Sequence, residues 1–297
     1  MKKLILFIFA VILAVVLSVY DTSPIYSIFN KEPEQFVNDE LLHVYYLDVS
    51  QADSIFVKLP DGENMLIDAG NKEDGDKIKN KLRSLGVKKI NYLVATHPHS
   101  DHIGGMEAVV RAFDIENIYM TNAPSNTETF EKLLLAIKQK GKTINIAKAG
   151  VDILSKDTLS IKFVAPNSDS YEDLNNYSAI IKLTYKNTSF LFTGDAEKLS
   201  EGEISENIKC DVLKVGHHGS NSSTSAAFLK KVKPEYAVIS CGFSNSYGHP
   251  HKEVISRLKA ANIKIYRTDL DGTVEAISDG SKIIFNTERG NLNEADN

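Results

Sequence analysis

One short stretch of this sequence concentrates side chains that bind metal ions. Three histidines and one aspartate fall within six residues, in the run His97-Pro98-His99-Ser100-Asp101-His102. Neutral imidazole and carboxylate groups are borderline to hard donors, which suit Zn²⁺, Mn²⁺ or Fe²⁺. The alternative is a solvated polar loop with chance histidines. We favour a metal site, because every other histidine except His43 also belongs to a short cluster.

The segments on both sides of this stretch would hold it in place. Residues 90–95 are an apolar run, which predicts a buried strand, and residues 106–111 predict the start of a helix. A strand fixes the position of the loop that follows it, and the loop presents its side chains. The pattern therefore predicts a metal-binding loop at the end of a strand.

A second candidate ligand, Asp195, lies where another apolar strand ends and a helix begins, in the run Phe192-Thr193-Gly194-Asp195-Ala196. A carboxylate has two oxygens, so Asp195 can hold two cations close together. The alternative role for this aspartate is a helix N-cap, which is common for Asp.

A third strand-like segment ends in two adjacent histidines, His217 and His218. Adjacent side chains at a strand end point in different directions, so we expect at most one of them to bind a metal directly. We assign that role to His217. His218 would then orient the site or donate a proton.

The last histidine cluster precedes a predicted helix, in the run His249-Pro250-His251. These side chains are expected at the rim of a cleft, where His249 would protonate a leaving group. An unperturbed imidazole pKa of about 6.5 suits that task. We interpret His251 as a helix cap or surface residue, and His43 as a structural residue within a strand.

The histidine-rich run after a buried strand resembles the metal-binding signature of the metallo-β-lactamase fold hydrolases. The resemblance implies that His97 and His99 hold one metal, that Asp101 and His102 hold a second, and that Asp195 bridges the two. Two divalent cations, Zn²⁺ first and Mn²⁺ as the alternative, are the cofactors it implies. Asp101, together with His218 and His249, is also a predicted catalytic residue.

One missing histidine restricts which branch of the superfamily this chain resembles. Many members of this superfamily, true β-lactamases and glyoxalase-like hydrolases included, complete the first metal site with a histidine that falls between the equivalents of His102 and His217. This chain has no histidine in that interval, which argues against β-lactamase activity. The interval contains instead the run Asn175-Asn176-Tyr177-Ser178.

That run, with the segments at 47–53, 215–220 and 247–251, resembles the hydrolase domain of ComEC-type competence proteins and their stand-alone relatives. The match extends over residues 44–285. This chain departs from the branch at Ser50 and Ala52, where glycine is usual. Its relatives include choline-phosphate esterases, and DNA degradation is the task proposed for the competence members.

Three aspartates in the first quarter of the chain also need an interpretation. Asp68 ends a predicted strand and resembles the carboxylate that braces the ligand loop in this family. Asp53 has either the same role or faces the substrate. A plain turn or helix cap is the alternative for both, and the sequence assigns no role to Asp48.

The rest of the chain predicts many short strands and helices. Strands are predicted at 43–49, 54–59 and 64–67, and a hairpin is predicted around Lys186-Asn187. Two β-rich halves that each carry helices favour two sheets packed face to face with helices outside. The predicted fold class is therefore α/β, a metallo-β-lactamase-like αββα four-layer sandwich.

Composition sets the broad class of protein. The 297 residues are 42% hydrophobic and 25% charged, as in an ordinary globular protein. The net charge of −5 provides no overall basic field, which argues against tight non-specific DNA binding but not against a metal-assisted enzyme with local phosphate contacts. The two cysteines, Cys210 and Cys241, lie in or beside apolar runs, so we expect buried free thiols.

The N-terminal residues predict where in the cell the protein is located. A basic start followed by an apolar stretch predicts a signal peptide or signal anchor at 1–22. A linker is predicted at 23–40, a metallo-β-lactamase-like hydrolase domain at 41–288 and a flexible tail at 289–297. The protein is then expected to be extracellular, either secreted or anchored to the outer face of the cytoplasmic membrane.

Together these observations predict a binuclear metal-dependent hydrolase that uses a metal-bridged hydroxide. The expected substrate is a phosphodiester, either DNA or a wall-linked phosphodiester such as a choline phosphate. A lactonase or thioesterase is the alternative within the enzyme class, because the same hydroxide attacks carbonyl groups. A non-catalytic surface metal-binding module is the third hypothesis.

Overall fold

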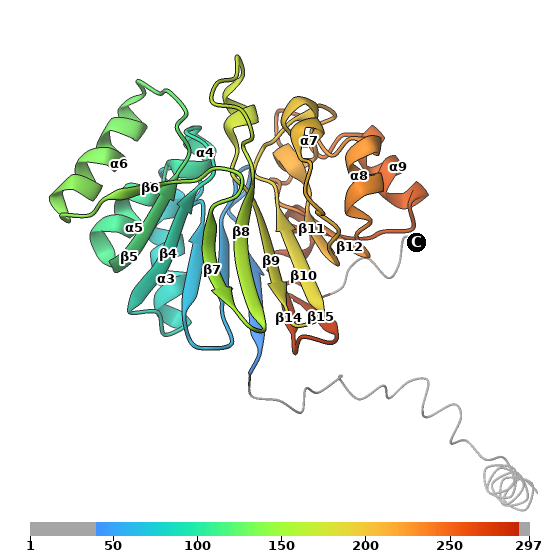
Figure 1. Cartoon of the computed structure of the whole chain (residues 1–297), viewed down its shortest axis with the longest axis horizontal. Coiled ribbons are helices and arrows are strands. Elements are labelled where there is room, and N and C mark those ends of the chain that lie inside the picture. Colours follow the sequence, from blue (N-terminus) through green and yellow to red (C-terminus); the bar gives the residue numbers. More distant parts are fainter. Residues whose placement is uncertain (1–39, 291–297) are drawn as a thin grey trace, which may run out of the picture. The chain divides into compact units, whose positions relative to one another are not determined.

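Two β-sheets enclose a shared hydrophobic core, and helices cover the outer faces of the sheets (Figure 1). The structure is a computed structural model that describes residues 40–290. The predicted leader at 1–22, nearly all of the predicted linker and most of the predicted tail lie outside the described residues. Within residues 40–290, no helix is both long and apolar enough to cross a membrane.

The first sheet has eight strands in the order β15-β14-β1-β2-β3-β4-β5-β6. The strands β1 to β3 pair antiparallel, whereas β3 to β6 pair parallel. The bounds are β1 Leu42–Tyr46, β2 Ile55–Lys58, β3 Asn64–Ile67, β4 Lys89–Ala95, β5 Asp114–Met120, β6 Ile144–Ile146, β14 Val274–Ser278 and β15 Ile283–Thr287.

The second sheet has seven strands in the order β13-β12-β11-β10-β9-β8-β7. The predicted hairpin around Lys186 is confirmed as β9 and β10, and the strands from β10 to β13 pair parallel. The bounds are β7 Asp152–Lys156, β8 Leu159–Ala165, β9 Ile180–Tyr185, β10 Thr188–Phe192, β11 Val212–Lys214, β12 Tyr236–Ile239 and β13 Lys264–Arg267.

The helices divide between the two sheets. Those between β3 and β6 pack on the first sheet, and those that follow β10 and β11 pack on the second (Figure 1). The bounds are α3 Asp74–Ser84, α4 Ser100–Ile103, α5 Met106–Ala112, α6 Glu128–Gln139, α7 Lys198–Glu203, α8 Ala226–Val232, α9 Lys252–Ala260 and α10 Thr268–Asp271, with the 3-10 turns η1 Leu174–Tyr177 and η2 Gly216–Gly219.

Alternate side chains of the central strands enter different cores. In β4, Tyr92 and Val94 pack between the two sheets, whereas Leu93 and Ala95 pack beneath the helices. A strand that is covered on both faces has no solvent-facing side, so its sequence is a continuous apolar run. The ligand loops therefore begin from strands that are held firmly on both sides.

The structure confirms the predicted α/β fold class and the αββα sandwich. It differs locally at residues 100–103, which were expected to be loop and form the single-turn helix α4. A single turn is too short to show helical periodicity in a sequence, and its stability comes from tertiary packing.

Candidate metal centre

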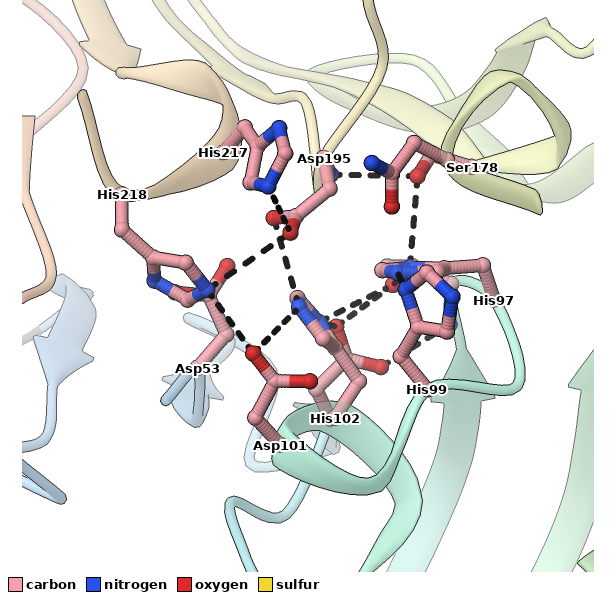
Figure 2. A network of polar contacts seen from close by, with 12 residues as sticks. Asp53, His97, His99, Asp101, His102, Ser178, Asp195, His217 and His218 are labelled. Atoms are coloured by element: carbon pink, nitrogen blue, oxygen red, sulfur yellow. Dashed lines mark hydrogen bonds and ion pairs between the residues drawn. The ribbon is translucent and has the colours of Figure 1, made fainter. Parts of the chain in front are cut away.

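The candidate ligands converge in segments that follow strands of both sheets, and Figure 2 shows their side chains directed toward one another. Helix α4, which follows β4, carries Asp101 and His102. Asp195 follows β10, and His218 lies in η2 directly after β11. Side chains from three separate segments therefore meet in one place, as ligands at the carboxyl ends of strands commonly do.

Four of these side chains form a compact group. The ligand atoms of Asp101, His102, Asp195 and His218 all lie within 4.8 Å of one another. His218 Nε2 lies 3.2 Å from Asp101 Oδ2 and 3.6 Å from Asp195 Oδ2. His102 Nε2 lies 3.3 Å from Asp195 Oδ1. Two imidazoles and two carboxylates thus face a common point.

His97 and His99 lie beside this group, on the side of His102. His97 Nε2 is 2.9 Å from His99 Nδ1, and the ring centroids of His97 and His102 are 4.1 Å apart. Burial, followed by the neighbouring His102, holds the pKa of His97 well below its usual range. The ring is therefore in the neutral form, which is the form that binds metal ions.

Two buried polar atoms at the centre test whether a metal ion fits. Among the described residues, neither His102 Nε2 nor Asp195 Oδ1 has a hydrogen-bond partner, although the two atoms face one another. Leaving such atoms buried without a partner is costly, and a cation bound between them would satisfy both. Imidazole and carboxylate are the donors that Zn²⁺ and Mn²⁺ accept, so the residues fit a divalent metal ion.

The electrostatics of the group favour a bound cation. Burial acts to raise the pKa of Asp101 and Asp195, but nearby histidines, His102 first, hold both well below the usual range. Burial also opposes a charge on His102, yet the carboxylates of Asp195, Asp68 and Asp101 raise its pKa well above the usual range. The carboxylates of Asp101 and Asp195 therefore stabilise a positive charge at the centre of the group.

Asp68 braces the histidine-rich loop, as the sequence predicted. Its Oδ1 accepts a hydrogen bond from the Thr96 amide at 2.8 Å, and its Oδ2 accepts one from the Thr96 hydroxyl at 2.6 Å. His102 Nδ1 lies 2.7 Å from Asp68 Oδ2. With Nδ1 bonded to this carboxylate, the ring of His102 presents Nε2 to the centre.

Asp53 performs the equivalent task for His218. His218 Nδ1 lies 3.3 Å from Asp53 Oδ1 and 3.0 Å from the Ser240 carbonyl oxygen. Asp53 Oδ2 is 2.7 Å from Lys214 Nζ, and both side chains are buried. Burial opposes the charge of Asp53, but Lys214 and His218 lower its pKa to about 2. A buried ion pair therefore orients the imidazole.

The two adjacent histidines have different surroundings. His218 is 2% exposed and belongs to the compact group. His217 is 24% exposed; its Nε2 lies 3.6 Å from Asp195 Oδ2, while its Nδ1 faces Glu197 at 3.5 Å and Ser222 at 3.2 Å. The divergence of the two rings agrees with the sequence expectation, but the more deeply placed ring is His218. The ligand assignment to His217 stays a prediction, and in this geometry His218 is the better placed of the two.

The backbone of η2 explains why the two adjacent rings have different surroundings. His217 and His218 both have positive φ angles, 49° and 52°. Two successive left-handed residues turn the chain sharply after β11, so the two rings approach Asp195 from different directions (Figure 2), and only His218 is fully buried. Residues at a strand end are expected to be extended, and no local pattern in the sequence predicts this turn.

A pocket of about 260 Å³ opens over the centre. His249 lies at its rim, with its Nδ1 3.3 Å from Gln51 Nε2 and its ring 5.7 Å from the ring of His217. Burial, followed by the nearby histidines, lowers the pKa of His249 to about 4. A neutral ring is thus favoured. The position at the rim agrees with the sequence expectation, while the role as proton donor stays a prediction.

The sequence indicated some supporting residues only indirectly. Ser178 Oγ accepts a hydrogen bond from the Asp195 amide at 3.0 Å and lies 3.3 Å from His97 Nδ1. In the sequence, Ser178 was indicated only by its place in the run 175–178, which lies in the interval without histidine between His102 and His217. Lys214 is buried within β11, and a lysine in an apolar strand was the overlooked signal for a buried ion pair.

Known sequences resemble this chain over most of its described length. A family model described as the metallo-beta-lactamase superfamily matches residues 47–242. ComE operon protein 3 of Bacillus subtilis is 32% identical over 249 residues, which cover 77% of this chain and 32% of the relative. Competence protein ComA of Neisseria gonorrhoeae is 32% identical, with 77% and 31% covered. Recombination protein 2 of Haemophilus influenzae is 28% identical, with 77% and 28% covered. The chain therefore spans about a third of the length of these relatives.

Solved structures share the fold at low sequence identity. The metallo-beta-lactamase fold protein YhfI from Bacillus subtilis aligns with a TM-score of 0.54 at 12% identity, covering 83% of this chain and 100% of that one. CmlA, a diiron beta-hydroxylase from Streptomyces venezuelae, aligns with a TM-score of 0.52 at 11% identity, covering 82% and 55%. These likenesses support the fold alone.

Proposed function

Since this chain belongs to the metallo-beta-lactamase superfamily, we propose that its buried histidine and aspartate cluster is the centre of a binuclear phosphodiesterase. The chain is a hydrolase of that fold, and the phosphodiester specificity is the step that we add. The observation that carries the metal centre is the meeting of imidazoles and carboxylates from three strand ends within 4.8 Å.

The residues divide into two metal sites that share one carboxylate. His97 and His99 would hold one cation, and Asp101, His102 and His218 the other, with Asp195 between them. Two divalent cations, when bound, supply Lewis acidity and a water molecule of lowered pKa. Two cations held side by side would suit a phosphodiester, because a two-metal site can stabilise both the attacking and the leaving oxygen of an in-line displacement.

The rim of the pocket would receive the leaving group. The Tyr247 ring is 67% exposed, lines the pocket and stacks on His249 with ring centroids 5.7 Å apart. His249 is held by Gln51 and stands within ring contact of His217. An exposed aromatic ring next to an imidazole can support an organic leaving group while the imidazole hydrogen-bonds its oxygen.

The substrate that we favour is DNA. The names of two relatives refer to competence and to recombination, which supports a task on DNA. This chain spans about a third of those relatives, so their whole-protein activities serve only as support. A wall-linked phosphodiester such as a choline phosphate is the second substrate that the same centre would accept.

We also place the reaction outside the cytoplasm. The support is the basic and then apolar sequence at 1–22, which lies outside the described residues. Protease treatment of intact cells followed by immunoblotting provides the test. We expect the hydrolase domain to be degraded or to appear in the medium, and full protection together with absence from the medium would contradict this location.

The test of activity uses the full-length chain, freed of metal and reloaded with Zn²⁺ or Mn²⁺. Bis-p-nitrophenyl phosphate, single- and double-stranded DNA, a choline phosphate ester, a lactone series and a thioester series are compared. We expect hydrolysis of phosphodiesters only. Turnover confined to lactones or thioesters would replace the proposal with the carbonyl alternative, and a folded, metal-loaded protein without any turnover would support a metal-binding module.

A further inference from the structure

The turn around η1 is attached to the metal centre at several points. Its N-cap, Asp173, accepts a hydrogen bond from the Asn175 amide at 2.8 Å, and the Asn175 carbonyl accepts one from the Ser178 amide at 3.0 Å. Asn176 Oδ1 accepts a hydrogen bond from the Ser200 amide at 3.2 Å, which ties the turn to α7. The backbone of Asn175 is therefore held on both sides.

The far end of the same turn contacts two of the candidate ligands directly. Ser178 Oγ accepts a hydrogen bond from the Asp195 amide at 3.0 Å and lies 3.3 Å from His97 Nδ1. The turn is thus positioned relative to both the bridging carboxylate and the first histidine. Any side chain that η1 directs toward the pocket is held in a fixed place relative to those two residues.

Within residues 40–290, the side-chain oxygen of Asn175 makes no such bond. The residue is 6% exposed and lines the pocket with His99 and Asp195. Among the described residues, its Oδ1 is buried and has no hydrogen-bond partner. Most buried polar atoms in native proteins are satisfied, so an orphaned acceptor on a residue that lines the pocket over the candidate metal centre calls for a cationic or donor partner.

The neighbouring chemistry identifies that partner. His97 and His99 are two ligands without a third histidine, because the chain has none between His102 and His217. An amide oxygen is a neutral, hard donor that binds divalent cations. We propose that Asn175 Oδ1 is the protein ligand that completes the metal site of His97 and His99. This inference depends on the two-metal centre of the proposed function.

The donor set then makes the two metal sites unequal. The site of Asp101, His102 and His218 has an anionic ligand of its own besides the shared Asp195. The site of His97, His99 and Asn175 has only neutral ligands of its own, and one of them is an amide oxygen in place of an imidazole. It should bind Zn²⁺ more weakly than the first and should accept Mn²⁺ readily, since harder oxygen ligands suit Mn²⁺.

Metal binding itself, rather than activity, provides the test. The metal-free full-length chain is dialysed against a series of Zn²⁺ and Mn²⁺ concentrations, and bound metal is quantified. We expect two cations per chain with distinct affinities. Asn175→Leu, which keeps the size and removes the oxygen, should weaken the second binding step by about 10- to 100-fold and leave the first step unchanged. Asn175→His should strengthen the second step for Zn²⁺ by about tenfold or more.

Two further variants separate a ligand from a structural residue. Asn175→Asp keeps an oxygen at the same position and should retain both binding steps. Asn187→Leu, on the exposed turn of the β9–β10 hairpin, is the matched control and should bind as the wild type does. The absorption spectrum of Co²⁺-loaded Asn175→His, compared with that of the wild type, gives an independent readout. Replacing an amide oxygen by imidazole changes the ligand field at one of the two ions.

The outcomes distinguish this inference from the proposed function. Two unaltered binding steps in a folded Asn175→Leu protein would overturn the inference and leave the binuclear hydrolase intact. A wild-type chain that binds one cation only would overturn the inference as well. A folded wild-type chain that binds neither Zn²⁺ nor Mn²⁺ would overturn both. Circular dichroism and thermal unfolding of the metal-free variants establish that each is folded.

Discussion

His218 Nε2 lies 3.2 Å from Asp101 Oδ2, although the two residues are 117 positions apart in the chain. Asp101 is carried by α4, which follows a strand of the first sheet, and His218 by η2, which follows a strand of the second. The candidate centre therefore joins the two halves of the sandwich. A cation held between these residues would also link the two sheets.

Metal binding should accordingly stabilise the whole domain. A ligand present at a hundredfold excess over its Kd, and bound only by the folded state, contributes about 2.7 kcal/mol. For a domain of this size we expect Zn²⁺ or Mn²⁺ to raise the Tm of the chelator-treated protein by roughly 5–10 °C. Differential scanning calorimetry measures the shift. Mg²⁺, which prefers oxygen ligands in an octahedral arrangement, is the control and should raise the Tm less.

Asp195 should be the residue whose loss is most damaging to the centre. Its Oδ1 faces His102 and its Oδ2 faces His217 and His218. We expect Asp195→Asn to lower kcat/KM on bis-p-nitrophenyl phosphate by more than about 100-fold, because even residues that only support metal ligands cost about 10- to 100-fold. Asp169→Asn, at an exposed side chain, is the matched control. Equal activity of the two variants at equal metal content would contradict the bridging role.

The adjacent histidines should respond differently to the same substitution. His218→Ala removes a buried ring that faces two carboxylates, so we expect loss of the tighter cation from the purified protein. His217→Ala removes a ring that is 24% exposed, so we expect it to keep that cation and to lose substrate affinity or rate. Metal content and steady-state kinetics measure both. The opposite order of metal loss would restore His217 as the direct ligand.

Lys214 should matter for stability as well as for the site. Its ammonium is buried against Asp53 at 2.7 Å, and Asp53 in turn contacts His218. Removing one partner of a buried ion pair leaves the other charge uncompensated and costs about 3–5 kcal/mol. We expect Lys214→Met to lower the free energy of unfolding by about that amount in urea titrations. A loss of unfolding free energy below about 1 kcal/mol would show that the charge of Asp53 is compensated by other groups. Lys230→Met, at an exposed position on α8, is the control variant.

Much of this protein was determined by local sequence patterns. The apolar run at 90–95 predicted a buried strand and the run around Phe192 predicted an apolar strand, and both strands are present as β4 and β10. The residue types in the histidine-rich run limited the chemistry to a metal site. Such features are local, because strand and helix periodicity and donor chemistry are properties of neighbouring residues.

Only the tertiary structure decided how distant segments meet. The left-handed turn at His217 and His218 determined which ring enters the centre, and the packing of one sheet on the other brought Lys214 to Asp53. That Asn175 Oδ1 has no hydrogen-bond partner within residues 40–290 depends on the position of η1 beside the pocket. Distances between side chains that are far apart in the chain depend on how the sheets pack, and no local pattern encodes them.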